Sequence, residues 1–123
     1  MQYQIPKRME VWNADLPLDE NSSIQGGYRP VLIVSNDICN EKNNVVTVVP
    51  LTSQIKRLSL PTHVLFEVKK GEESLALLEQ ITTIEKKLLC SYVGTLKRMD
   101  RRIVEAAMRD HLGLAKQEVR KCL

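Results

Sequence analysis

The segment Gly26-Gly27-Tyr28-Arg29-Pro30 is the part of the chain best suited to bind or act on an anion. Two successive glycines let a backbone turn sharply or approach another molecule closely. Arg29 follows them and is fixed by Pro30, and a guanidinium held in this way can clamp a phosphate and stabilise charge on a phosphorane. The same residues are also compatible with a surface arginine in a β-turn, paired with Asp15 or Glu20.

Thr52 and Ser53 form a second candidate site, directly after the β-branched stretch Val45–Leu51. Their hydroxyl groups, beside Gln54, can donate hydrogen bonds to phosphate oxygens. Hydroxyl residues at such a position also begin ST-turns, in which they bond to the local backbone. The residue types alone therefore indicate an anion site and leave the structural role open for each candidate.

The commoner catalytic and metal-binding patterns are missing from the sequence. The two histidines, His63 and His111, lie in an expected strand and an expected helix, so structural roles are favoured for both. The three cysteines show no C-x-x-C spacing and form neither a disulfide framework nor a zinc site; they are Cys39, Cys90 and Cys122. We therefore expect reduced thiols, no metal and no other cofactor.

The length of 123 residues is typical of one domain, so we expect a single domain over residues 1–123. With 43% hydrophobic and 27% charged residues, the composition excludes a disordered chain. No apolar run approaches the roughly 20 residues that span a bilayer, and the first ten residues lack the apolar core of a signal peptide. We expect a cytoplasmic protein with no membrane association.

The net charge of +3 is concentrated towards the C-terminus, where residues 97–123 hold eight basic and four acidic residues. Such a segment attracts polyanions or an acidic protein, or simply forms a solvated helix face. The five aromatic residues are fewer than in modules that stack RNA bases on rings; they are Tyr3, Trp12, Tyr28, Phe66 and Tyr92. If the protein binds nucleic acid, hydrogen bonds and backbone charge must carry most of the affinity.

The hydrophobic pattern predicts a series of short strands followed by one helix, which is typical of a small barrel or curled sheet with a helix at one end. The expected strands are Met9–Leu16, Arg29–Ser35, Val45–Leu51, Pro61–Val68, Ser74–Glu85 and Leu88–Val93. The expected helix is Lys97–Leu112, ended by Gly113. Pro50 suggests an edge, a bulge or the last turn of its strand. The long connection Pro17–Tyr28 is of a kind that is often functional.

Several ordered stretches between about Lys7 and Leu114 resemble the MazF/PemK family, the toxins of type II toxin–antitoxin systems. Their order and spacing together are far more specific than any one of them. The stretches are Trp12–Leu16, Gln25–Val34, Asn36–Ile38, Leu51–Ile55, Leu60–Val64, Leu77–Ile84 and Gly94–Leu96. Residues Ala115–Leu123 extend past the resemblance and have no assigned function.

The resemblance implies an α+β, mostly β fold: a small SH3-like, CcdB-like antiparallel barrel with a C-terminal helix, forming a homodimer. It also implies a sequence-specific, metal-independent endoribonuclease that cleaves single-stranded RNA, chiefly mRNA, and is inhibited by a cognate MazE-like antitoxin. Cleavage by the 2′-OH would leave a 2′,3′-cyclic phosphate and a 5′-OH. The family's catalytic arginine and threonine correspond to Arg29 and Thr52. The positions expected to contact RNA correspond to Gln25, Gly26, Gly27, Ser53 and Gln80.

The sequence departs from the family pattern at two places near these positions. Met9-Glu10 replaces a Gly-acid pair, and Ile24 takes the place of an acid before Gln25, which leaves a loop carboxylate without an expected role. Two other functions are compatible with such a barrel: a gyrase poison that does not cut RNA, and a non-catalytic nucleic-acid-binding module. Arg29 with Thr52 favours the ribonuclease, because a gyrase poison needs no phosphate clamp there. A guanidinium is nevertheless a poor general base, so the general acid and base stay unassigned.

Overall fold

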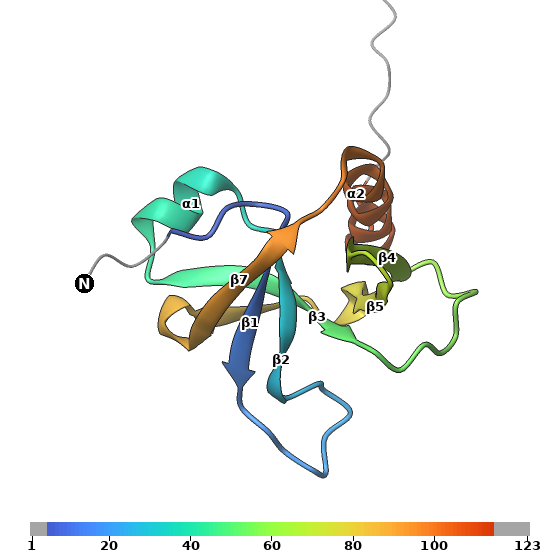
Figure 1. Ribbon diagram of the computed structural model, residues 1–123, viewed down its shortest axis with the longest axis horizontal. Coiled ribbons are helices and arrows are strands. Elements are labelled where there is room, and N and C mark those ends of the chain that lie inside the picture. The colour runs from blue at the N-terminus through green and yellow to red at the C-terminus, as the bar shows by residue number, and fades with distance from the viewer. Residues whose placement is uncertain (1–4, 115–123) are drawn as a thin grey trace, which may run out of the picture.

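The computed structural model describes residues 5–114, which form a curled antiparallel sheet with one long helix beside it (Figure 1). The sheet order is β4-β5-β3-β2-β1-β7, and β6 pairs with β3. The expected mostly-β fold with a C-terminal helix is confirmed. The elements are β1 Glu10–Leu16, β2 Gly27–Ile33, α1 Asp37–Lys42, β3 Val45–Thr52, β4 His63–Lys69, β5 Glu72–Leu77, the 3₁₀ turn η1 Leu78–Gln80, β6 Thr82–Glu85, the 3₁₀ turn η2 Lys86–Leu88, β7 Leu89–Thr95 and α2 Arg98–Leu112.

Strand β3 is the central strand of the sheet, and it changes partner along its length. Its first half, Val45–Val48, pairs with β6, whereas Leu51 and Thr52 pair with β5. Pro50 lies between these two segments, where the ladder to β6 has ended and the ladder to β5 has not begun. A proline, which has no N–H to donate, is tolerated at such a break. Of the possibilities for Pro50, the sheet edge is therefore excluded.

The prediction of one strand over Ser74–Glu85 is wrong. The chain leaves the sheet after Leu77, makes the 3₁₀ turn η1 and re-enters as β6 at Thr82. The turn places Leu78 fully in the core, and the Leu78 backbone N–H donates to the Thr62 carbonyl at 2.9 Å. The helix-favouring residues of this segment therefore prevail for one turn, and the β-branched residues after them form the strand.

Two apolar clusters lie on opposite faces of the sheet, because side chains alternate along each strand. In β2, Leu32 belongs to the cluster inside the curl, whereas Val31 and Ile33 belong to the cluster on the other face. Helix α2 covers the first cluster with its buried residues Val104 and Ala107. The fold is thus a sheet that is buried on both faces around β2.

Both helices have residues suited to their ends, and Gly113 ends α2 as expected. The Asn36 side chain accepts a hydrogen bond from the Cys39 backbone N–H at 2.8 Å and begins α1. Gly113 adopts a left-handed conformation, with φ of 67°, and ends α2. No helix within residues 5–114 is long and apolar enough to cross a membrane.

Replacing Leu32 with alanine tests the importance of the cluster inside the curl. Leu32 is fully buried, so L32A should lower the free energy of unfolding by about 2–5 kcal/mol. L18A is the matched control, because the Leu18 side chain is exposed and its removal should change that free energy by less than about 0.5 kcal/mol. Urea denaturation followed by circular dichroism measures both, and equal effects would contradict this assignment of the core.

Candidate active site

The connection between β1 and β2, residues 17–26, folds back on itself at Gly26. A Cβ atom at Gly26 would lie 2.2 Å from the Pro17 carbonyl oxygen, so only glycine allows the two ends of the connection to cross this closely. Gly27 follows with φ of 82°, in the left-handed region that favours glycine. The two glycines therefore have separate roles, a close crossing and a reversed backbone angle, and together they direct the chain into β2.

The pairing of β2 with β3 brings the two predicted catalytic residues together. The β2–β3 ladder ends with Val31 paired to Pro50. Arg29 lies two residues beyond this last pair on β2, and Thr52 lies two residues beyond it on β3, where it pairs with Leu75 of β5. Arg29 Nη1 also donates to the carbonyl oxygen of Leu51 at 3.4 Å.

The Arg29 guanidinium is half-buried and is held by neutral acceptors. Its Nε donates to the Gly26 carbonyl at 2.8 Å, and its Nη1 donates to Oε1 of Gln25. These bonds fix the plane of the guanidinium, while its Nη2 has no protein acceptor among residues 5–114. The geometry suits a clamp whose remaining N–H groups are directed at an anionic ligand.

Gln80 connects the turn η1 to the 17–26 connection. Its side-chain oxygen accepts from the Gln25 backbone N–H at 2.7 Å, and its side-chain nitrogen donates to the Ser23 carbonyl at 3.1 Å. Gln80, Gln25, Gly26 and Arg29 therefore belong to one hydrogen-bonded network, although they come from distant parts of the sequence.

Thr52 and Ser53 lie at the end of β3 in different environments. Thr52 Oγ1 accepts from the Gln54 backbone N–H at 3.1 Å, which is the local turn that the sequence left open. Because an accepting hydroxyl keeps its own hydrogen, the Thr52 O–H is still a donor. Ser53 is exposed and makes no side-chain hydrogen bond within the described part of the chain, so the structure does not join it to the network.

His63, for which the sequence favours a structural role, contacts a carboxylate that sequence reasoning did not single out. Its Nε2 lies 2.7 Å from Oε1 of Glu79, and its Nδ1 lies 3.2 Å from the Lys56 carbonyl oxygen. Partial burial acts to raise the pKa of Glu79, but hydrogen bonds from its own backbone N–H, from His63 and from Thr62 outweigh burial and hold that pKa below its ordinary value. The only sequence signal that could have indicated Glu79 is its position next to Gln80, which the resemblance assigns to RNA binding.

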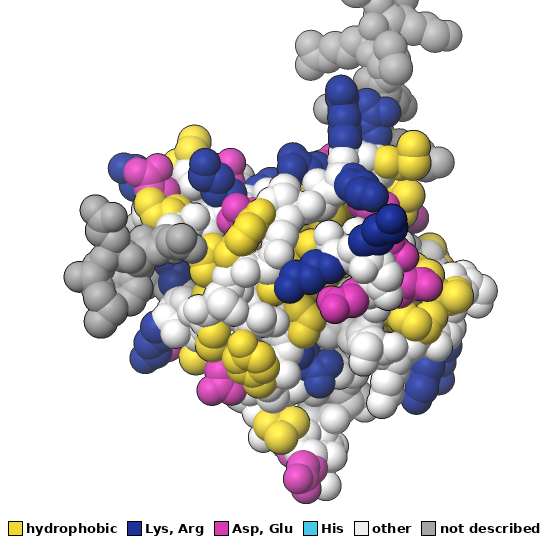
Figure 2. Space-filling view, in the orientation of Figure 1, with side chains coloured by type: hydrophobic (Ala, Val, Ile, Leu, Met, Phe, Trp, Pro, Cys, Tyr) yellow, Lys and Arg dark blue, Asp and Glu magenta, His cyan; other side chains and the backbone are white. Residues whose placement is uncertain are grey.

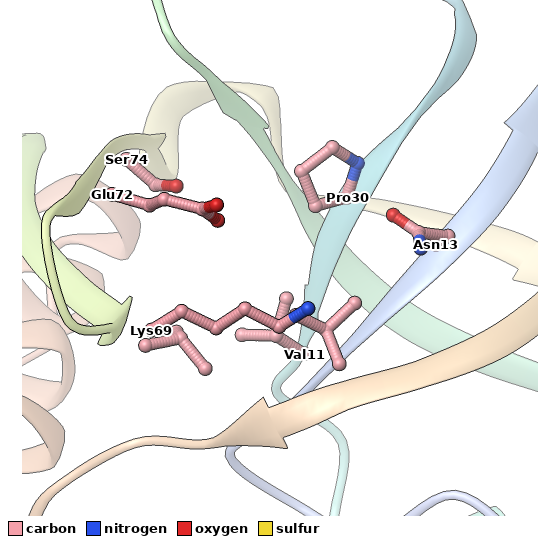
Figure 3. Close-up of a pocket in the computed structure, with 8 residues that line it drawn as sticks. Val11, Asn13, Pro30, Lys69, Glu72 and Ser74 are labelled. Atoms are coloured by element: carbon pink, nitrogen blue, oxygen red, sulfur yellow. The ribbon is translucent and has the colours of Figure 1, made fainter.

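A shallow cavity of about 260 Å³ lies between β1, β2 and β7 on one side and the β4–β5 hairpin on the other (Figure 3). Pro30 faces it, and because side chains alternate along β2, Arg29 projects from the opposite face. The carboxylate of Glu72 and the hydroxyl of Ser74 point into this space. None of the predicted site residues lines it.

No group of three or more His, Cys, Asp or Glu side chains within residues 5–114 is arranged to hold a metal ion. The donors that the hydrogen bonds leave free at the site, within residues 5–114, include the Nη2 group of Arg29 and the hydroxyl of Thr52. Such groups bind and stabilise oxyanions.

A model of the family described as PemK-like, MazF-like toxin of type II toxin–antitoxin system matches residues 7–112. The chain belongs to this family. The endoribonuclease EndoA of Bacillus subtilis strain 168 is 40% identical over 115 residues, which cover 89% of this chain and 97% of that protein. The expected MazF/PemK relationship is therefore confirmed.

Solved structures of MazF/PemK toxins have the same fold. MazF from Deinococcus radiodurans matches with a TM-score of 0.77 at 20% identity, covering 91% of this chain and 100% of that one. A mycobacterial endoribonuclease solved in complex with its cognate antitoxin matches with a TM-score of 0.72 at 25% identity, covering 94% of this chain and 100% of that one. The barrel-like sheet and C-terminal helix described above are thus those of the family.

Replacing Gln80 with alanine should release the 17–26 connection, because both of its anchoring hydrogen bonds are lost. In Q80A, the Gln25 amide should exchange its hydrogen about tenfold faster, as expected for loss of a partly buried hydrogen bond. Q80E is the matched control, because a glutamate keeps the oxygen that accepts from this amide. Hydrogen exchange followed by NMR measures the rates, and unchanged protection of Gln25 in Q80A would show that Gln80 does not hold the connection.

Proposed function

We propose that this MazF/PemK toxin is a sequence-specific, metal-independent endoribonuclease that cleaves single-stranded RNA, chiefly mRNA. The observation that carries this proposal is the fixed Arg29 guanidinium, which bonds to Gly26, to Gln25 and to the carbonyl of Leu51, the residue directly before Thr52. The endoribonuclease activity named for the Bacillus subtilis relative supports it.

The chemistry requires little from the protein, because RNA carries its own nucleophile. The 2′-oxygen loses its proton and bonds to the adjacent phosphorus, the bond from phosphorus to the 5′-oxygen breaks, and that oxygen takes up a proton. The products are a 2′,3′-cyclic phosphate and a 5′-OH. Arg29 binds the phosphate oxygens and stabilises the charge that develops on them, and the Thr52 hydroxyl donates to the same group. DNA is not cleaved, because it lacks the 2′-OH.

RNA binding is assigned to the residues around this pair. Gly27, which has open space where a Cβ would lie, lets the RNA backbone approach the protein backbone closely, whereas Gly26 acts through the fold by allowing the connection to cross Pro17. The exposed Ser53 offers a free hydroxyl beside Thr52. Gln25 and Gln80 act first through the protein, since Gln25 orients Arg29 and Gln80 holds the connection in place. Unpaired bases suit this site, because their Watson–Crick edges are exposed to hydrogen-bonding groups.

The Arg29 and Thr52 side chains should be required for cleavage. R29A should reduce the rate about 10²–10³-fold, the usual effect of removing one group that stabilises the transition state. T52A should also reduce it, whereas T52S keeps the hydroxyl and should retain most activity. R102A, on the outer face of α2, should change little.

The assay uses a long single-stranded RNA in EDTA, with the 5′ ends of the fragments mapped and a DNA copy of the same sequence as control. Discrete cuts that disappear in folded R29A support the proposal. If the wild-type protein cuts none of several RNAs, the proposal is wrong and a gyrase poison or a non-catalytic binding barrel becomes the better explanation.

We further propose that the protein acts in the cytoplasm as a homodimer and is inhibited by an acidic, MazE-like antitoxin. Figure 2 shows Lys and Arg side chains gathered over α2, where Lys97, Arg98 and Arg102 are exposed. The mycobacterial relative solved with its antitoxin supports a protein partner. This basic surface lies on α2, away from the Arg29–Thr52 pair, so it is better suited to the partner than to the scissile phosphate.

Antitoxin binding should depend on charge at α2. The affinity should fall as ionic strength rises, and R102E should weaken binding further, since complementary charges steer and orient such complexes. K70E, in the β4–β5 turn, is the matched control on another surface. Calorimetric titration of the antitoxin at several salt concentrations measures these effects. An affinity indifferent to both salt and R102E would contradict docking on this surface.

A further inference from the structure

His63 occupies an unusual position for a histidine with no assigned role. It is the first residue of β4, its side chain is only 8% exposed, and its ring lies between the turn η1 and the 53–62 connection. From η1 it contacts the Glu79 carboxylate, and from the connection it contacts the Lys56 carbonyl oxygen. The imidazole thus extends the contact between these two segments, which are already joined near Thr62 by the bond from the Leu78 N–H, to the middle of the connection at Lys56.

Both atoms that face the ring nitrogens are hydrogen-bond acceptors. A neutral imidazole has one N–H and can donate to only one of them, whereas an imidazolium has two N–H groups and donates to both. The ionised carboxylate favours the cation further, and the lowered pKa of Glu79 keeps this carboxylate charged at neutral pH. Both acceptors therefore receive a hydrogen bond only when His63 carries a proton on each nitrogen.

Among the groups described around His63, Glu79 has the strongest electrostatic effect on the charge of the ring, because the others are apolar or exposed. From β5, its cross-strand neighbour is the apolar Leu77. Helix α2 packs towards β4 and η1 through the apolar Val104 and Ala107. In the connection, the side chains of Lys56 and Arg57 are exposed, so water screens their repulsion of the imidazolium.

The two linked segments also position the candidate active site. The 53–62 connection starts immediately after Thr52, and Glu79 directly precedes Gln80, which holds the 17–26 connection. A bond between the connection and η1 therefore fixes the end of β3 relative to the network around Arg29.

We propose that His63 is a positioning residue whose protonated ring latches the 53–62 connection onto η1, and that the latch opens when the ring loses a proton. The latch itself follows from the contacts of His63. Its effect on RNA cleavage rests on the function proposed above. Glu79 stays ionised until the pH falls below the ordinary range of glutamate, so the opening on raising the pH belongs to the imidazole.

Limited trypsin digestion tests the latch without any RNA, because Lys56 and Arg57 lie in the connection that it holds. Cleavage there is measured relative to cleavage at Lys69 and Lys70 in the β4–β5 turn, which cancels the pH dependence of trypsin. The ratio should rise about tenfold in H63A and in E79A, as expected for the loss of a charge-assisted hydrogen bond. It should rise similarly in the wild type when the pH is raised until the imidazole has lost one of its two ring protons.

H111A is the matched control, since His111 is exposed on α2 and should leave the ratio unchanged. NMR of the ring nitrogens supplies a second readout, because the rise in the trypsin ratio should accompany the loss of one His63 ring proton. A trypsin ratio unchanged in both folded H63A and folded E79A, or a ratio that rises in the wild type while His63 keeps both ring protons, would overturn the proposal.

RNA cleavage measured against pH tests the consequence for the site. At low pH the wild type should exceed H63A about tenfold in kcat/KM, and the two should converge as the pH rises, because deprotonation of His63 has the same effect as its removal. H111A should follow the wild type. Equal profiles of wild type and H63A would refute the positioning role. If the wild type cuts no RNA, the proposed function fails, and the trypsin ratio still decides whether the latch exists.

Discussion

The register between β2 and β3 is the constraint on which the rest of the site depends. Pairing of Val31 with Pro50 brings the Arg29 side chain to the end of β3, where it reaches the Leu51 carbonyl, and a shift by one residue would send Arg29 to the opposite face of the sheet. Apolar clusters on both faces resist such a shift, because it would exchange Val31 and Ile33 with Leu32 and its neighbours. The two-sided core is thus what gives a small surface site its geometry.

The sequence carries the parts of this site that depend on local chemistry. Two adjacent glycines followed by Arg29 and Pro30 indicate a sharp turn into a strand, and the structure shows the turn and the close crossing at Gly26 that requires it. The helical period of α2 and its terminal Gly113 are equally local, so they too could be predicted.

The remaining features depend on contacts between distant segments. The stretch from Ser74 to Glu85 contains residues that favour a helix and residues that favour a strand, and the burial of Leu78 decides where one gives way to the other. The partner of His63 could not be predicted for the same reason, since Glu79 reaches it only after η1 folds against β4. The role of Gln80 in holding residues 17–26 was likewise hidden, because a glutamine has no preferred partner in sequence.

The neutral acceptors around Arg29 determine the electrostatic potential of the site. Two backbone carbonyls and one side-chain amide orient its guanidinium, and no carboxylate within residues 5–114 forms an ion pair with it. Dipoles direct the group without cancelling its unit charge, so the resting site keeps an uncompensated positive potential. An arriving phosphate, or an acidic side chain of an inhibitor, therefore needs to displace only water and breaks no internal ion pair.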